Sequence, residues 1–184
     1  MDASYYQGMV CAAVAVLDFP HLKPIEQAVV KIPLSFPYIP GLLSFREAPG
    51  ILAALEQLSQ LPDVLIVDGH GQAHPRRFGL ACHLGVWLDL PTIGCAKSVL
   101  VGELAPLGAK VGSTAQLTLG TEVLGIALRT RNNMKPVYLS IGHRMDLFSA
   151  AEIILACTKG YRLPEPSRQA HFLAKSACHP LEDK

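Results

Sequence analysis

Apolar residues in the first third of the chain gather in short continuous runs that predict β-strands. Residues 10–19 are apolar except for Asp18. This run is too short for a helix before it meets Pro20, so it is typical of a buried strand. Residues 28–32 predict a partner strand, and residues 1–6 predict a first strand, which we expect at the centre of a sheet. The opening third therefore predicts a β-meander.

A stiff loop and a helix are expected next. Residues 33–41 contain three prolines, which exclude a central strand or a helix interior. Pro49 is expected near the start of the long part of the helix that follows, where a proline is tolerated. In residues 42–61, apolar positions recur with the spacing of one helix face, at Leu43, Ile51, Leu52, Leu55 and Leu58.

The remaining pattern alternates between strands and helices. Short apolar segments predict strands at residues 64–67, 92–96, 123–129 and 136–141. Helical spacing predicts helices at residues 81–88 and 147–157. Alternation after an opening meander predicts an α/β fold in which helices pack on a mixed β-sheet. The 184 residues fit one domain, with residues 161–184 as a peripheral tail rich in proline and charge.

Composition excludes several classes of protein. Half of the residues are apolar and 17% are charged, which favours a folded chain over a disordered one. The longest apolar run, residues 8–17, is about half of a membrane span, and no basic stretch precedes it. We therefore expect no membrane segment and a cytoplasmic protein, or a nuclear one in a eukaryote. The five cysteines form no CxxC pair, which indicates reduced, buried thiols and no zinc finger.

Charge is distributed unevenly along the chain. Residues 1–75 carry a net charge of −4 and residues 76–184 a net charge of +5. This asymmetry suits an acidic site facing a basic surface that could hold phosphates. Ordinary surface charge scattered by chance explains it equally well.

Asp68 is the first candidate for chemistry. It follows the apolar strand at residues 64–67 and precedes a Gly-His-Gly turn. Ligands of α/β sheets gather beyond the carboxyl ends of the strands, so a carboxylate at this position is suited to a site. A turn-forming aspartate that accepts hydrogen bonds from local amides is the alternative interpretation.

Two further carboxylates, Asp2 and Glu47, gain meaning from the expected topology. Asp2 lies on the first strand and Glu47 lies near the start of the first helix. Carboxylates that converge from separate elements are the ligands that Mg²⁺ requires, and Mg²⁺ can assist phosphodiester hydrolysis. Taken singly, Asp2 could be a frayed terminus and Glu47 a helix charge favoured by the dipole.

His143 follows Ile141-Gly at the end of an expected strand. It could bind a metal or assist proton transfer to water, although a lone histidine is more often structural. His70 and His74 lie four residues apart on a glycine-containing loop, which argues against a helical zinc site. The sequence contains no GxGxxG pattern, no GxxxxGK[ST] phosphate loop and no nucleophile elbow.

Five segments in one order resemble the endonuclease V family and together span nearly the whole chain. They are Phe36-Pro-Tyr-Ile-Pro-Gly-Leu-Leu-Ser-Phe-Arg-Glu47, Val67-Asp-Gly-His-Gly-Gln-Ala-His-Pro-Arg76, Pro91-Thr-Ile-Gly-Cys-Ala-Lys97, Ile141-Gly-His143 and Arg162-Leu-Pro-Glu-Pro166. The resemblance implies a ribonuclease H-like α/β fold and a Mg²⁺ cofactor, with Mn²⁺ as an alternative. It further implies hydrolysis of the second phosphodiester 3′ to deoxyinosine in DNA or inosine in RNA. We expect the chain to be a monomer.

The resemblance also implies roles for individual residues. Asp2, Glu47 and Asp68 resemble the metal carboxylates, His143 the active-site histidine and Lys97 the active-site lysine, which can pair with the scissile phosphate. The stiff segment Pro37, Tyr38, Ile39 and Pro40 resembles a wedge that separates strands. The implied pocket for a flipped base, with Arg76 as a further substrate contact, comprises Gly41, Leu43, Gly69, Gly71, His74, Gly79 and Leu80.

Two departures from the family pattern define the alternatives. His70 stands where relatives often have Gln or Asn, and only Met1 precedes Asp2, where relatives have a helix and several residues. The second departure favours, as an alternative, a catalytically impaired module that binds inosine or branched nucleic acid. Another ribonuclease H-like nuclease, such as a junction resolvase, would need a different loop in place of Pro37 to Pro40.

Overall fold

The computed structural model describes residues 1–179, which fold into two compact units. The first unit comprises Met1–Pro62 and the segment that begins at Pro166. The second unit comprises Asp63–Glu165. The expectation of a single domain over the whole chain stays a prediction.

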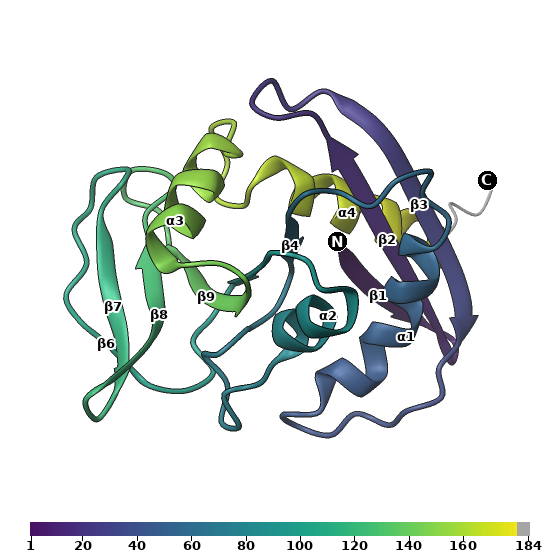
Figure 1. Ribbon diagram of the computed structural model, residues 1–184, viewed down its shortest axis with the longest axis horizontal. Coiled ribbons are helices and arrows are strands. Elements are labelled where there is room, and N and C mark those ends of the chain that lie inside the picture. The colour runs from purple at the N-terminus through teal and green to yellow at the C-terminus, as the bar shows by residue number, and fades with distance from the viewer. Residues whose placement is uncertain (180–184) are drawn as a thin grey trace. The chain divides into compact units, whose positions relative to one another are not determined.

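The first unit contains a three-stranded antiparallel sheet, shown in purple and blue in Figure 1. Its strands are β1 (Asp2–Tyr6), β2 (Met9–Leu17) and β3 (Pro24–Pro33), in the order β1-β2-β3. The predicted meander is confirmed, although β3 begins earlier than expected. Within this sheet β1 is an edge strand, so the expected central position is wrong.

Helix α1 (Leu43–Leu55) packs against one face of this sheet. Gly50 allows the close approach, because a Cβ there would lie 3.1 Å from the Cβ of Ala12. The predicted helix over residues 42–61 ends early, and Pro49 lies inside it rather than near its start. Beyond the helix, the Ser59 amide and hydroxyl donate hydrogen bonds to the Glu26 carboxylate on β3, which draws the chain out of helical geometry.

Helix α4 (Glu165–Cys178) belongs to the opposite face of the same sheet. Its Cys178 thiol lies against Cys11, whose side chain points away from the face that Ala12 shares with α1. Ala170, Ala174 and Cys178 are fully buried. The expectation of a peripheral tail is therefore wrong for residues 165–178, and residues 180–184 of that tail lie outside the described residues.

The second unit is built on a six-stranded mixed sheet with the order β4-β5-β9-β8-β7-β6. Its strands are β4 (Leu65–Val67), β5 (Thr92–Ala96), β6 (Glu103–Leu104), β7 (Thr114–Leu119), β8 (Glu122–Leu128) and β9 (Val137–His143). Strands β4 and β5 are parallel, and the other neighbours are antiparallel. Helix α2 (Leu80–Leu88) packs on β4, β5 and β9, and α3 (Leu147–Ala156) packs on β8 and β9. The predicted α/β fold with a mixed sheet is confirmed.

Two strands of this sheet, β6 and β7, were not predicted. In β7 the buried residues Ala115 and Leu117 alternate with Thr114, Gln116 and Thr118. This period of two is the mark of a half-buried strand, and it extends to Leu119, which is exposed. None of the helices in residues 1–179 has the length and apolar character needed to cross a membrane.

Candidate active site

Asp68 and Lys97 meet where β4 and β5 end, at the edge of the six-stranded sheet that the ends of its strands form. Asp68 directly follows β4, and Lys97 directly follows β5. Because β4 and β5 are parallel and paired, the residues after their carboxyl ends lie side by side, and the Lys97 ammonium donates a hydrogen bond to Oδ2 of Asp68. The Asp68 side chain is 14% exposed and that of Lys97 is 41% exposed. The edge therefore presents a partly buried carboxylate with an accessible cation beside it.

Arg162 fixes the backbone at this edge. Its guanidinium donates hydrogen bonds to the carbonyl oxygen of Lys97 and, at 2.8 Å, to that of Pro136. Its own carbonyl oxygen accepts a bond from the Thr130 hydroxyl at 2.6 Å. The structure thus gives the arginine of the 162–166 segment a positioning role that sequence reasoning had not assigned.

His143 lies at the opposite ends of the strands, beside the start of β5. The register pairs Val67 with Gly94 near the end of β5, but His143 with Thr92 at its start. The Nε2 atom of His143 lies 3.1 Å from Oδ1 of Asp89. The structure therefore does not bring His143 together with Asp68 and Lys97, and its predicted catalytic role has no geometric support.

Asp2 in the first unit is bound by His171, which sequence reasoning missed. Nδ1 of His171 on α4 lies 2.6 Å from Oδ2 of Asp2, and the Ala3 amide donates to Oδ1 at 2.8 Å. Asp2 is only 8% exposed. A helical stripe of Ser167, Ala170 and Ala174 beside His171 was the available signal, because it orients α4 towards the sheet.

Glu47 on α1 is 7% exposed and is held by Tyr5. The Tyr5 hydroxyl donates a hydrogen bond of 2.7 Å to Oε1 of Glu47. The Arg46 guanidinium lies over the Tyr5 ring, 4.4 Å from its centroid. Burial, and then the negative charge of Glu47, raise the pKa of Tyr5, so this residue remains a proton donor at neutral pH.

The proline-rich loop before α1 exposes the residues of the predicted wedge. Pro37 to Pro40 are all exposed, and Tyr38 most conspicuously, at 73%. Gly41 turns the chain with a φ of +77°, a backbone conformation that favours glycine, and Leu43, 37% exposed, begins α1. Arg46 donates to the carbonyl oxygen of Phe36, whose ring lies 5.6 Å from that of Phe45. The base of the loop is therefore anchored while its tip faces solvent.

Glycines of the loop over residues 68–80, the predicted base pocket, are required by the fold itself. A Cβ on Gly71 would overlap the carbonyl oxygen of Ile141, and one on Gly79 would overlap that of His70. At Gly69 a Cβ would meet only ordinary contacts, 3.7 Å from Leu80. Close packing of backbone within the unit therefore accounts for Gly71 and Gly79 without any contact to a base.

The same loop is fastened to the β7–β8 hairpin. Ala73 packs with Leu117 and Leu124 in a small core, and the Arg77 guanidinium makes a two-pronged bond to the Glu122 carboxylate at 2.7–2.9 Å. His74 is 6% exposed, whereas the neighbouring Arg76 is exposed.

His70 faces the end of β5 from within this loop. Its Nε2 lies 3.0 Å from the carbonyl oxygen of Ser98. Burial lowers the pKa of His70, so its ring is neutral at pH 7 and donates this bond. His70 thus joins the loop to the chain that follows Lys97.

The chemistry of the acidic residues fits a hard divalent cation. Asp2, Glu47 and Asp68 all offer carboxylate oxygens, the ligands that Mg²⁺ and Mn²⁺ prefer. Two of them are nearly buried, where added positive charge lowers the cost of desolvation. Within residues 1–179, no three His, Cys, Asp or Glu side chains are grouped so that they could hold a metal ion. Asp2 and Glu47 belong to the first unit and Asp68 to the second, and their role as a shared set of metal ligands stays a prediction.

A mixed sheet with flanking helices and an aspartate directly after a buried strand defines a ribonuclease H-like protein. Solved structures agree. Endonuclease V from Streptomyces avermitilis superposes with a TM-score of 0.92 at 47% identity, covering 96% of this chain and 78% of that one. Endonuclease V from Ciona intestinalis, solved with a 24mer DNA containing an inosine followed by a ribo-adenosine, gives 0.84 at 30% identity, covering 98% and 85%.

Sequence comparison identifies the family. The family model described as Endonuclease V matches residues 1–172. Endonuclease V of Gloeobacter violaceus is 58% identical over 166 residues, which are 90% of this chain and 68% of the relative. The chain belongs to the endonuclease V family, whose members are nucleases.

Proposed function

We propose that this chain is a metal-dependent endonuclease that cleaves the second phosphodiester 3′ to deoxyinosine or inosine. The observation that carries the proposal is the Asp68–Lys97 pair at the edge of a ribonuclease H-like sheet. The Ciona intestinalis relative, whose structure contains an inosine-bearing DNA, supports the substrate class. The enzyme would act in repair of nucleic acid or in turnover of inosine-containing RNA.

The catalytic roles follow from charge and position. Asp2, Glu47 and Asp68 would hold Mg²⁺ or Mn²⁺, which supplies a polarised water and stabilises the leaving oxygen. Lys97 can leave Asp68 to pair with the scissile phosphate, since its side chain is accessible. His171 holds the Asp2 carboxylate in one orientation, and Tyr5 does the same for Glu47.

Recognition of the base would use two loops. Tyr38, at the tip of Pro37 to Pro40, would fill the gap that a flipped hypoxanthine leaves in the stack. Gly41, Leu43 and the loop over residues 69–80 would surround the flipped base, with Arg76 as an exposed cation for the adjacent backbone. We propose further that the whole chain acts as one domain and as a monomer. Its location would be the cytoplasm, or the nucleus in a eukaryote.

The proposal is tested by cleavage of matched oligonucleotides. DNA and RNA strands that differ only by inosine in place of guanosine are incubated with Mg²⁺, with Mn²⁺ or with EDTA. We expect cuts only in the inosine strands, only with metal, and at the second phosphodiester on the 3′ side. Equal cutting of the guanosine strands contradicts the specificity. Tight inosine binding without cleavage favours the alternative binding module.

A further inference from the structure

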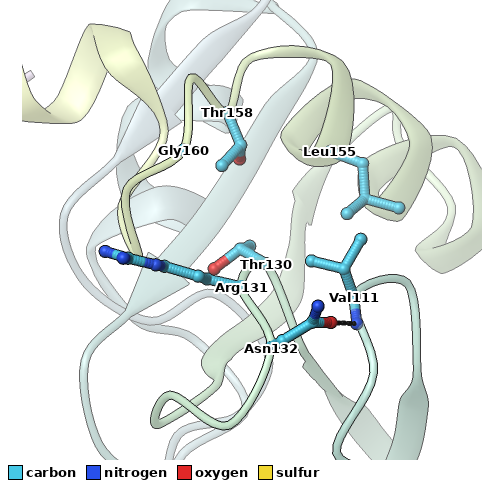
Figure 2. Close-up of a pocket in the computed structure, with 7 residues that line it drawn as sticks. All are labelled: Val111, Thr130, Arg131, Asn132, Leu155, Thr158 and Gly160. Atoms are coloured by element: carbon cyan, nitrogen blue, oxygen red, sulfur yellow. Dashed lines mark hydrogen bonds between the residues drawn. The ribbon is translucent and has the colours of Figure 1, made fainter.

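A pocket of about 740 Å³ opens in the second unit, outside the residues assigned above. Figure 2 shows Val111 and Leu155 pointing towards each other on one side, with Thr158 and Gly160 across from Arg131. The pocket lies among the segment after β8, the end of α3 and the loop before β7. Its lining residues are Val111, Thr130, Arg131, Asn132, Leu155, Thr158 and Gly160.

The register places this pocket on the same edge of the sheet as Asp68 and Lys97. The first residues of β9 pair with the ends of both neighbours, Val137 with Leu128 and Tyr138 with Ala96. The carboxyl ends of β8 and β5 therefore lie at one edge, separated by a single strand, about 10 Å from each other. Arg162 links these two strand ends directly. Its guanidinium donates a hydrogen bond to the Lys97 carbonyl oxygen, and its own carbonyl oxygen accepts one from the Thr130 hydroxyl.

The charges at the pocket favour an anion. Within residues 1–179, the guanidinium of Arg131 has no hydrogen bond or ion pair, and the residue is exposed. Residues 123–143 contain no Asp or Glu, but they contain Arg129, Arg131 and Lys135. An unpaired, planar guanidinium in a positive surrounding is suited to a phosphate.

The remaining lining suits the rest of a nucleotide. Val111 and Leu155 provide an apolar wall for a sugar or a base face. Oδ1 of Asn132 accepts the Val111 amide at 2.8 Å, which fixes the side chain and leaves its amide nitrogen directed elsewhere. In the described part of the chain this nitrogen has no partner, so it can donate to a base. Apolar walls with a few placed polar groups are typical of small-molecule sites.

We propose that this pocket binds one nucleotide of a single strand, outside the segment that reacts. Its phosphate would pair with Arg131, and its sugar and base would lie against Val111 and Leu155. The proposal rests on the proposed function in one respect, that the strand reaches the pocket from Asp68 and Lys97. A second contact of this kind would lengthen the footprint of the enzyme on its strand and hold it in one direction.

The test measures binding of inosine-free single-stranded DNA in EDTA, using oligonucleotides of about 8 and about 24 nucleotides. Arg131→Gln removes the cation, and Val111→Glu places a carboxylate at the exposed apolar wall. Arg144→Gln is the matched control, because it removes one positive charge from the opposite edge of the same sheet, where Arg144 pairs with Asp89 at 2.8 Å. Thermal melting verifies that every variant is folded.

We expect Arg131→Gln to weaken binding of the longer strand about five- to tenfold and to reduce its salt slope by about 0.7. The loss should be smaller for the shorter strand, and Val111→Glu should weaken binding of the longer strand at least as much. If both variants bind the longer strand as tightly as Arg144→Gln does, the proposal that the pocket binds a nucleotide is wrong. Because these strands lack inosine, that result leaves the proposed cleavage untouched. Conversely, absence of inosine cleavage by the unaltered chain overturns the proposed function without deciding the pocket.

Discussion

Nδ1 of His171 lies 2.6 Å from Oδ2 of Asp2, although 169 positions separate the two residues in sequence. The contact joins α4 to the first residue of β1. It orients a nearly buried carboxylate that would otherwise rotate about its side-chain bonds. Partners of metal-binding carboxylates typically control the affinity for the ion as strongly as some ligands do.

His171→Ala is therefore expected to lower kcat/KM for inosine-containing DNA about 10- to 100-fold. The cause is loss of the orientation of Asp2, so a higher Mn²⁺ concentration should be needed for half-maximal cleavage. A metal titration of the cleavage rate measures both effects. The control is His179→Ala, since this histidine lies just after α4, against the Tyr6 ring. Equal Mn²⁺ dependence of the two variants contradicts the role of His171.

Asp68→Asn is expected to reduce cleavage at least about 100-fold while leaving the fold nearly intact, because a metal ligand contributes several kcal/mol to transition-state stabilisation. The side chain is partly solvated, so loss of its ion pair with Lys97 should change stability little. Single-turnover rates and melting temperature are measured together. The exposed Asp63, just before β4, supplies the control Asp63→Asn. A variant at Asp68 that cuts at the original rate shows that the site is assigned wrongly.

Tyr38→Ala is expected to weaken binding to an inosine-bearing duplex by about 1–3 kcal/mol, the contribution of stacking by one aromatic ring. Since Tyr38 is 73% exposed, the melting temperature should not change. Fluorescence anisotropy in EDTA measures the affinity. Phe148→Ala, at a ring that is 72% exposed in the other unit, is the control. An unchanged duplex affinity for Tyr38→Ala excludes the wedge role.

Tyr5→Phe removes the hydroxyl that donates to Glu47. Because Glu47 is only 7% exposed, its carboxylate cannot replace this bond freely with water. We expect the free energy of unfolding to fall by about 1–3 kcal/mol, measured by urea denaturation. Tyr6→Phe is the control, since the Tyr6 hydroxyl accepts a hydrogen bond from the exposed side-chain amide of Gln7. This substitution should change the free energy of unfolding by less than about 0.5 kcal/mol. Equal losses in both variants contradict the argument.

The Arg77–Glu122 pair predicts a pH effect on the loop over residues 68–80. The hydrogen bond from Arg77 holds the pKa of Glu122 below its ordinary value. The stabilisation of the loop by this ion pair is therefore present above the ordinary pKa of a glutamate, about 4.3. It is lost as the pH falls through the lower pKa of Glu122 in the folded state. Glu122→Gln should speed hydrogen exchange of this loop at pH 7, whereas below both pKa values the two proteins should converge. A difference that persists at low pH contradicts the ion-pair explanation.

Most strands were predictable because their signals are local. The apolar runs that form β2, β4 and β5 are continuous, so adjacent residues alone indicate that both faces of the strand are buried. Helix α4 was hidden because its buried stripe consists of small residues, Ser167, Ala170, Ala174 and Cys178, in a polar segment. Pro49 shows the reverse problem, since packing of α1 on the sheet tolerates a residue that isolated helices avoid.

The candidate site was predictable only in part, because strand direction is not a local property. Asp68 and His143 both follow apolar segments, so both qualified as residues at a strand end. Strand β9 runs antiparallel to β5, which puts the two ends at opposite edges. The pairing of His171 with Asp2 was hidden for the same reason, because only the folding of distant elements brings the two residues together.

All five cysteines are buried thiols, as predicted, and they are shared between the two units. Burial raises the pKa of Cys11 and of Cys95 to about 12, and that of Cys157 to about 11. Alkylating reagents attack the thiolate, which is scarce and shielded while the chain is folded. The rate of labelling therefore reports how often the protein opens. Labelling of Cys11 and Cys178 reports opening of the first unit, and labelling of the other three cysteines reports opening of the second. Comparison of the two labelling rates therefore shows whether the two units open together.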